Sequence, residues 1–130
     1  FADKHGLKPL ARILSCGIHA QAPEWFTTAP VQAMKNALKK ANLSSGDIDL
    51  WEVNEAFAVV ALAAAKGLEI NESKLNVNGG GISLGHPIGS SGARILVTLL
   101  YAMANRNAKL GLGSLCIGGG EGIAMVIERT

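Results

Sequence analysis

Apolar residues recur along the chain with two different periods, which predict an alternation of strands and helices. Residues 10–20 are rich in strand formers, and Pro23 follows shortly after them. The next segment has Pro30 in its first turn and carries apolar residues at helical spacing, namely Val31, Met34, Leu38 and Ala41. The pattern therefore predicts a first strand and then an amphipathic helix that packs one face on the core.

The segment 56–65 has no polar side chain in any of its ten positions. Its alanines favour a helix over a strand, and it is shorter than the roughly 20 residues that a bilayer-spanning helix needs. A helix that is apolar on every side has to be buried on every side. We therefore expect protein to cover this helix all round.

Two more strands and a third helix are expected between and after these elements. Residues 48–53 predict a strand, and residues 75–78 predict a short strand that leads into a cluster of glycines. The third helix begins at Ser90 or Ser91, either of which can cap it, and continues to about Met103.

The last two strands, 110–117 and 123–128, are joined by a short glycine-rich connection, which predicts an antiparallel hairpin. The order of elements is thus βαβαβαββ. Because strand–helix–strand crossovers are right-handed, this order predicts an α/β fold with a mostly parallel five-stranded sheet, helices on both faces and an antiparallel last strand. With 130 residues, we expect a single domain over residues 1–130.

Composition narrows the functional classes. Hydrophobic residues make up 48% and charged residues 17% of the chain, which is the balance of a globular protein rather than a disordered one. The net charge of +2 argues against a nucleic-acid or membrane-surface partner, and no apolar run is long enough to span a bilayer. The chain begins without methionine and has no signal-peptide pattern, so we expect a soluble piece of a longer polypeptide.

The two cysteines, Cys16 and Cys116, lie far apart, with no CxxC spacing and no paired histidines. This argues against a disulfide framework or a metal site and is typical of a reducing compartment such as the cytoplasm, or the mitochondrial matrix in a eukaryote. Glycine is the unusual component: 16 residues, of which six fall in 79–92 and six in 111–122. Such clusters mark sharp turns or close approaches of the backbone.

Three loops are expected at one edge of the sheet, beyond the carboxyl ends of the parallel strands, where open α/β sheets place their sites. They carry Asn54 after the second strand, His86 within the first glycine cluster, and Cys116 before the second. An amide, an imidazole, a thiol and glycine N–H groups can together perform acyl chemistry, as an acid/base pair with donors for an oxyanion.

Each of these residues also has a structural interpretation. Asn54 could cap a helix, His86 could be a hydrogen-bonded turn residue, and Cys116 could be a small buried hydrophobe. Cys16, His5 and His19 are expected to have no functional role. The glycines could cradle a phosphate, although neither GxGxxG after a strand nor GxxxxGK[ST] is present.

Three motifs resemble those of the thiolases and occur in that family's order. Residues 78–94 read NGGGISLGHPIGSSGAR, which is similar to the GHP motif of the family. Residues 54–58 read NEAFA and resemble its NEAF motif, and residues 116–122 read CIGGGEG and resemble its CxGGGxG motif. The similarity covers nearly the whole chain, which therefore resembles the C-terminal domain of a thiolase.

Within the family, the GHP motif is most similar to that of acetyl-CoA acetyltransferases, also called acetoacetyl-CoA thiolases. Degradative 3-ketoacyl-CoA thiolases tend to have leucine in place of Ile88 and Cys-Thr in place of Ser90 and Ser91. Gly81 stands where the motif usually has alanine, a change too small to disturb the site.

The resemblance implies a Claisen condensation of two acetyl-CoA molecules to acetoacetyl-CoA, and the reverse thiolysis, with no metal or redox cofactor. His86 would activate the nucleophilic thiol and hold the thioester oxygen of the second substrate, where Asn54 would anchor a water. Cys116 would move the proton at the acetyl α-carbon, with its thiol pKa tuned toward neutrality by nearby donors and imidazole. The Gly118 N–H would serve a second oxyanion hole, and Phe57 would contact the substrate.

One feature of the family is missing. The acyl-accepting cysteine of thiolases belongs to their N-terminal domain, and the residues around Cys16 do not match its motif. The resemblance therefore implies half of a catalytic site, which packs against an N-terminal thiolase domain in a homodimer or homotetramer. The alternatives are a 3-ketoacyl-CoA thiolase, a non-catalytic domain that binds acyl-CoA or lipid, and a phosphate-binding module.

Overall fold

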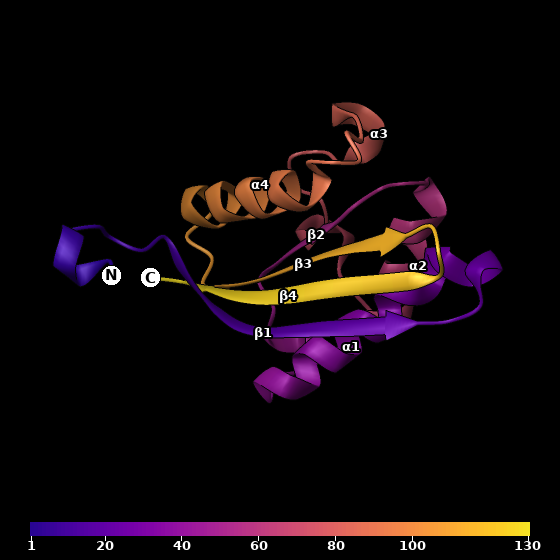
Figure 1. The fold of residues 1–130 in the computed structure, drawn as a ribbon, viewed down its shortest axis with the longest axis horizontal. Helices are drawn as coiled ribbons and strands as arrows, with labels where there is room; N and C mark the ends of the chain where they lie inside the picture. Colours follow the sequence, from indigo (N-terminus) through magenta and orange to yellow (C-terminus); the bar gives the residue numbers. More distant parts are fainter.

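A four-stranded mixed sheet forms the centre of the computed structural model, which describes residues 1–130 (Figure 1). Its strands are β1 (Ala11–Ala20), β2 (Leu50–Val53), β3 (Leu110–Ile117) and β4 (Glu121–Arg129), in the spatial order β1-β4-β3-β2. Strand β2 pairs with β3 in parallel, whereas β4 is antiparallel to both of its neighbours. The β3–β4 hairpin was expected, and it is confirmed.

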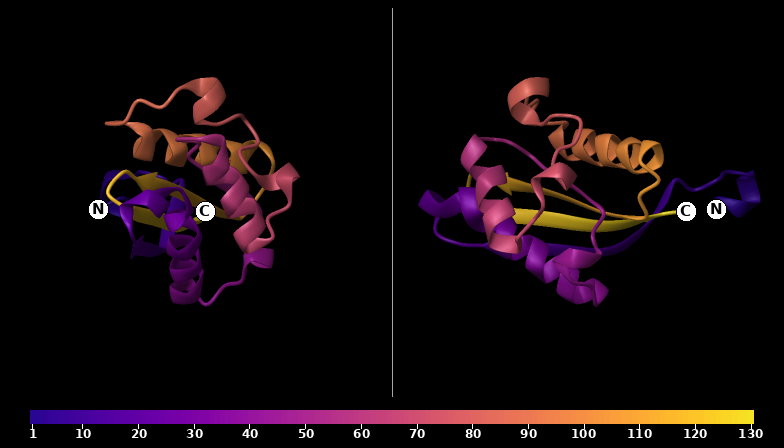
Figure 2. Two further views of the ribbon diagram at one scale, coloured as in Figure 1. Left: turned by 90° about the vertical axis from the view of Figure 1, so that its right-hand side faces the viewer. Right: turned by 180° about the vertical axis from the view of Figure 1, so that it is seen from behind.

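Helices cover both faces of the sheet, as the pattern predicts. Helix α4 (Ser91–Asn105) lies on one face, and α1 (Ala29–Ala41) lies on the other together with α2 (Ala58–Leu68) (Figures 1 and 2). A single helical turn, α3 (Gly81–Leu84), lies near the carboxyl ends of β2 and β3, at the end of the sheet opposite the two chain termini (Figure 1). Four short 3-10 helices occupy the connections at Asp3–His5, Pro23–Thr28, Ser45–Asp47 and Glu72–Lys74.

The strand count and the pairing differ from the expectation. Residues 75–78 do not form a fifth strand, because they make only isolated parallel bridges, from Leu75 to Trp51 and from Val77 to Gly79. Asn76 has a left-handed backbone with φ 47°, and its side-chain amide pairs with both the N–H and the C=O of Val53. The Asn76 side chain thus makes the hydrogen bonds to β2 that the backbone of a neighbouring strand would otherwise make. The sheet is also not mostly parallel, because β4 lies between β3 and β1.

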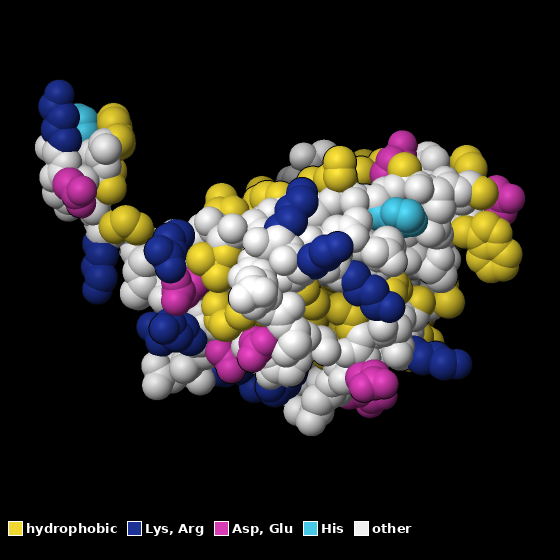
Figure 3. Space-filling model, turned by 90° about the horizontal axis from the view of Figure 1, so that it is seen from below, with side chains coloured by type: hydrophobic (Ala, Val, Ile, Leu, Met, Phe, Trp, Pro, Cys, Tyr) yellow, Lys and Arg dark blue, Asp and Glu magenta, His cyan; other side chains and the backbone are white.

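Two apolar clusters hold the layers together. The larger one joins the sheet to α1 and α2 and is built around Met34, Trp51 and Leu112. The smaller one joins the sheet to α4 and includes Leu99 and Met103. The α1 side of the molecule carries scattered Lys and Arg side chains among acidic and apolar ones, as expected over the outer face of an amphipathic helix (Figure 3). No helix has both the length and the apolar character to cross a membrane.

Helix α2 is covered by this chain on one side only, so the expectation that protein covers it all round stays a prediction for its other side. Val60, Ala64 and Leu68 are buried against the sheet and α1, whereas Val59 is 49% and Leu62 64% exposed. Contacts within this chain therefore explain why one side of α2 is apolar, but not why its exposed side is apolar too.

Glycines in the strands let the helices approach closely. A Cβ atom on Gly17 of β1 would lie 2.2 Å from the Ala33 carbonyl oxygen and 2.4 Å from the Ala37 nitrogen of α1. On the other face, a Cβ on Gly111 of β3 would lie 2.5 Å from the sulfur of Met103 in α4. Real Cβ atoms do not come this close to other atoms, so these layers are packed as tightly as the absence of a side chain allows.

Candidate active site

Asn54 lies directly beyond the carboxyl end of β2. Its N–H donates to the Ser114 carbonyl at 2.9 Å, which extends the β2–β3 pairing by one residue, and its side chain is completely buried. It does not cap a helix, because α2 begins after Phe57 and receives no side-chain cap. The structure thus rules out the capping interpretation of Asn54.

His86 lies in the connection between α3 and α4 and is held on both sides of its ring. Its Nε2 is 3.4 Å from Asn54 Nδ2, and its Nδ1 is 2.5 Å from the hydroxyl of Ser91, the first residue of α4. Asn54 and His86 are 32 residues apart in sequence. The fold therefore brings together two of the side chains that the motifs single out.

An ion pair lies behind Asn54. Arg94 of α4 donates from Nη1 to Glu52 Oε1 at 2.7 Å and from Nη2 to Asn54 Oδ1 at 3.2 Å. Burial raises the pKa of Glu52 to about 7, although the hydrogen bond and the charge of Arg94 act in the opposite direction. Sequence reasoning missed both residues. The available signal was the carboxylate between Trp51 and Val53 in the expected strand 48–53, which needs a partner if it is buried.

Cys116 lies at the same edge of the sheet, as the next-to-last residue of β3. Its side chain is 7% exposed and belongs to the apolar cluster on the α1–α2 side. Burial raises the pKa of the thiol above its usual range, and the thiol makes no hydrogen bond to Asn54 or His86. Within this chain the thiol pKa is thus set mainly by burial, and its tuning by donors and imidazole stays a prediction for the complete site.

Gly118 begins the exposed turn between β3 and β4, and a Cβ atom there would meet nothing within 4 Å. The side of Gly118 on which a side chain would lie is therefore open, and its role as an N–H donor stays a prediction. Phe57 is 59% exposed and packs edge-to-face on Phe26, with ring centroids 6.1 Å apart. It makes no hydrogen bond or ring contact with Asn54 or His86.

Glu55 fastens the first glycine cluster to the end of β2. Its carboxylate accepts from the Ile82 N–H at 3.1 Å and from Asn76 Nδ2 at 3.1 Å, and it packs directly against Gly80. A phosphate in this loop would have to compete with a carboxylate that already occupies an N–H group and would be repelled by its charge. This contact argues against the phosphate-binding interpretation.

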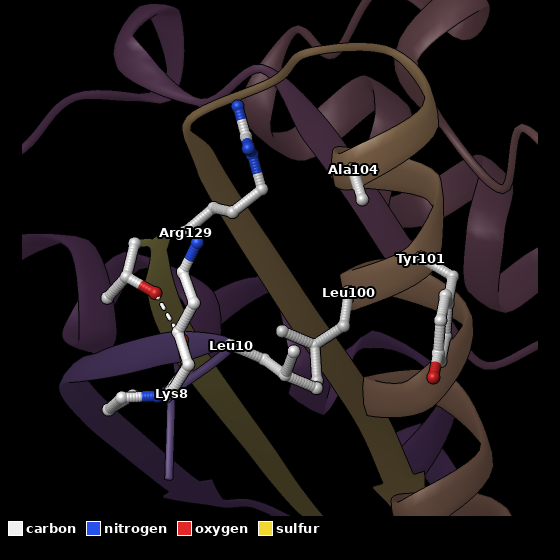
Figure 4. Close-up of a pocket in the computed structure, with 8 residues that line it drawn as sticks. Lys8, Leu10, Leu100, Tyr101, Ala104 and Arg129 are labelled. Carbon is white, nitrogen blue, oxygen red and sulfur yellow. Dashed lines mark hydrogen bonds between the residues drawn. The ribbon is translucent and has the colours of Figure 1, made fainter. Parts of the chain in front are cut away.

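The remaining candidates lie elsewhere. Cys16 is exposed on β1, His19 bonds to Gln21, and His5 stacks on Phe1. No group of three metal-ligating side chains is present. A cavity of about 220 Å³ near the chain termini is lined by Leu10, Leu100 and Tyr101 among others (Figure 4). Its Arg129 side chain extends away from Leu10 and Leu100, and its Nε and Nη2 donate to the Ala108 carbonyl and to Asn107 Oδ1 (Figure 4).

Comparison with known proteins decides the family. The family model for the thiolase C-terminal domain matches residues 7–129. This chain belongs to the thiolase family. Among curated thiolases, it is 59% identical over 124 residues to the acetyl-CoA acetyltransferase of Escherichia coli, covering 95% of this chain and 32% of that protein. It is 50% identical over 125 residues to the acetyl-CoA acetyltransferase of Schizosaccharomyces pombe, covering 96% of this chain and 32% of that protein.

The fold agrees with solved thiolase structures. The crystal structure of human mitochondrial 3-ketoacyl-CoA thiolase superposes with a TM-score of 0.96 at 49% identity, covering 99% of this chain and 33% of that one. The acetyl-CoA acetyltransferase of Bacillus anthracis also superposes with a TM-score of 0.96, at 44% identity, and covers the same shares of the two chains. The thiolase domain described here thus spans about a third of the length of the relatives that it matches.

Proposed function

We propose that this thiolase domain is the C-terminal catalytic half of an acetyl-CoA C-acetyltransferase. The observation that carries the proposal is the contact between Asn54 and His86 at the carboxyl ends of the parallel strands, 3.4 Å between Nδ2 and Nε2. A polar pair brought together from 32 residues apart, at an edge that also carries Cys116, suits acyl transfer. The acetyltransferase names of the E. coli and S. pombe relatives support the choice of substrate.

The proposed reaction proceeds through an acyl-enzyme. His86 takes the proton of a nucleophilic thiol, which attacks the acetyl thioester and releases CoA. Cys116 gives its proton to the departing CoA thiolate, and the Cys116 thiolate then removes a proton from the α-carbon of a second acetyl-CoA. The resulting carbanion attacks the acyl-enzyme to give acetoacetyl-CoA, and His86 returns its proton to the released thiolate. Asn54, through a water, and His86 stabilise the enolate oxygen, while the Gly118 N–H faces the oxyanion of the acyl group. Thiolysis is the reverse.

The nucleophilic thiol in this scheme comes from an N-terminal thiolase domain. Cys16 is on β1, outside the contacts that join Asn54 and His86, and Cys116 has the acid/base role. A partner surface is available beside the site, where α2, α3 and the loop after α3 expose apolar side chains, namely those of Val59, Leu62, Ile82, Leu84 and Ile88. We further propose that the complete enzyme is a homodimer or homotetramer of the cytoplasm or the mitochondrial matrix and uses CoA thioesters without a cofactor.

A second candidate is a 3-ketoacyl-CoA thiolase for longer chains, which the 49% identity to the human enzyme favours. One solved structure of that human enzyme is a complex with CoA. A non-catalytic domain that binds acyl-CoA or lipid is the third candidate. It has no need of a hydrogen-bonded amide–imidazole pair, and the contact between Asn54 and His86 counts against it.

Domain replacement tests the proposal. This chain replaces the matching segment of the E. coli acetyl-CoA acetyltransferase in one chimera and of the human 3-ketoacyl-CoA thiolase in another. We expect the first chimera to cleave acetoacetyl-CoA at a rate near that of its parent, and the second to lose activity on long chains relative to its parent. Retention of long-chain activity together with loss of acetoacetyl-CoA cleavage would favour the second candidate.

The variant His86→Ala supplies the catalytic control. We expect it to lower kcat of the first chimera by about 10²–10⁴-fold, because a general base is lost. His19→Ala is the matched control, since His19 bonds only Gln21. A folded first chimera that binds CoA but shows no turnover would support the non-catalytic candidate instead.

A further inference from the structure

Four side chains from three elements form one continuous hydrogen-bonded row beneath the candidate site. Glu52 of β2 accepts from Arg94 of α4, Arg94 donates to Asn54 Oδ1, and Asn54 Nδ2 faces His86 Nε2. Each contact joins residues at least 32 positions apart in sequence. The row therefore depends on the relative placement of β2, α4 and the loop that holds His86.

Arg94 decides which way the Asn54 amide points. A guanidinium has only donors, so the amide group nearest to it has to be the oxygen. The opposite orientation would place the Asn54 NH₂ against a cation and lose the 3.2 Å hydrogen bond. Glu52, whose side chain is 1% exposed, in turn holds Arg94 at 2.7 Å and balances its charge. With the oxygen fixed on Arg94, the amide NH₂ is directed at the imidazole.

This orientation determines the tautomer of neutral His86. Because Asn54 presents a donor, Nε2 has to be the acceptor, and the ring proton is then on Nδ1. The other side of the ring leads to the same result. The single hydroxyl proton of Ser91 is donated to the Pro87 carbonyl at 3.1 Å, so Ser91 Oγ is left to accept from Nδ1–H at 2.5 Å.

We propose that Arg94 and Glu52 are positioning residues that act through Asn54 to keep the lone pair of His86 on Nε2. The tautomer follows from the hydrogen bonds alone. Its consequence rests on the proposed function: Nε2 is the ring nitrogen at the Asn54 side, and a lone pair there is what a base needs to take the proton of a thiol. In the opposite tautomer, Nε2 would carry a proton and could not accept one.

The tautomer can be read directly by NMR. In this chain labelled with ¹⁵N-histidine, the protonated and the unprotonated ring nitrogens have different ¹⁵N shifts, and His86→Gln assigns the signal of His86 among the three histidines. We expect the wild-type chain, at a pH where His86 is neutral, to carry its proton on Nδ1. A proton on Nε2 would overturn the proposal.

Two variants test whether the row of Glu52, Arg94 and Asn54 sets the tautomer of His86. The double variant Glu52→Leu with Arg94→Met replaces the buried pair by apolar side chains of similar volume, a change that folded proteins tolerate. We expect the Nε2–H form of His86 to appear in it, because the amide is free to turn. Asn54→Asp keeps the shape but presents oxygen to the ring, and we expect it to place a proton on Nε2. A folded variant of either kind that keeps the wild-type tautomer would refute the role assigned to the row.

The surface pair Arg12 and Glu128, which are 2.6 Å apart with side chains 70% and 22% exposed, supplies the matched control: Arg12→Met with Glu128→Leu should leave the tautomer of His86 unchanged. In the E. coli chimera, the double variant at Glu52 and Arg94 should lower kcat by about 100-fold with little change in KM. The reason is that the base, His86, is misoriented, whereas substrate binding is not affected. An inactive wild-type chimera would count against the proposed function only, since the NMR result reads the tautomer without turnover.

Discussion

Glu52 and Arg94 form an ion pair of 2.7 Å in which the Glu52 side chain is 1% exposed and the Arg94 side chain 19%. The other ion pairs of the chain, which Glu128 makes with Arg12 and Lys109, are at the surface. Glu52 Oε2 has no hydrogen-bond partner, so burial is only partly compensated by Arg94. This uncompensated burial is the cause of the raised Glu52 pKa and makes the stability of the fold depend on pH.

The stability of the chain should fall as Glu52 ionises. The pKa of Glu52 is about 7 in the folded state, against the ordinary value of 4.5 that applies to the unfolded chain. Between these two pH values the folded state therefore binds more protons than the unfolded one. The Glu52 contribution is therefore fully present below pH 4.5 and is lost as pH rises to 7, by on the order of 3 kcal/mol. Urea unfolding across this range should show a slope that Glu52→Gln removes; an unchanged slope would contradict the prediction.

Glu128 supplies a control, because its effect on the pH dependence of stability has the opposite sign to that of Glu52. Hydrogen bonds from Arg12 and Lys109 lower its pKa below the ordinary value of 4.5. Its contribution is thus present above that value and is lost as pH falls below it. Glu128→Gln should alter stability only in this acidic range and leave the slope above pH 4.5 unchanged.

Gly17→Ala should destabilise the fold by at least about 2 kcal/mol, because the new methyl group would collide with the backbone of α1, which cannot move aside as a side chain can. Gly89→Ala is the matched control, since a Cβ atom there meets nothing within 4 Å, and its effect should stay within about 1 kcal/mol. Chemical unfolding of both variants measures the difference. Equal stabilities would show that β1 and α1 are packed more loosely than the structure indicates.

Cys116→Ser in the E. coli chimera should abolish condensation while leaving acylation largely intact. A serine hydroxyl is too weak an acid to replace the thiol in proton transfer, whereas covalent capture is assigned to another cysteine. Intact mass after addition of acetyl-CoA should show the gain of one acetyl group. Cys16→Ser, on the exposed face of β1, should affect neither step. If Cys116→Ser loses the acyl-enzyme too while remaining folded, the role of Cys116 is wrong.

The chain alone should show no thiolysis of acetoacetyl-CoA, because neither of its cysteines is proposed as the acyl acceptor. The assay uses the chain that carries Asn54, His86 and Cys116, with the E. coli chimera as the positive control. Robust turnover by the chain alone would make Cys16 or Cys116 the nucleophile and reverse the assignment.

Local patterns in the sequence predicted the parts of the fold that depend on near neighbours. The helical spacing of Val31, Met34 and Leu38 predicted α1, and the glycines after Ile117 predicted the β3–β4 hairpin, because a helix face and a tight turn are properties of residues only a few positions apart. The motifs around Asn54, His86 and Cys116 predicted the family, which the comparison confirmed.

Only the tertiary structure decided what depends on distant partners. The strand order with β4 inside the sheet and the replacement of a fifth strand by the Asn76 side chain both follow from pairing between remote segments. The same holds for the row from Glu52 through Arg94 to His86. Its hydrogen bonds need atoms within about 3 Å, and no local period brings residues 32 to 42 positions apart to that distance. That placement comes from the register of β2 against β3 and from the packing of α4 on the sheet.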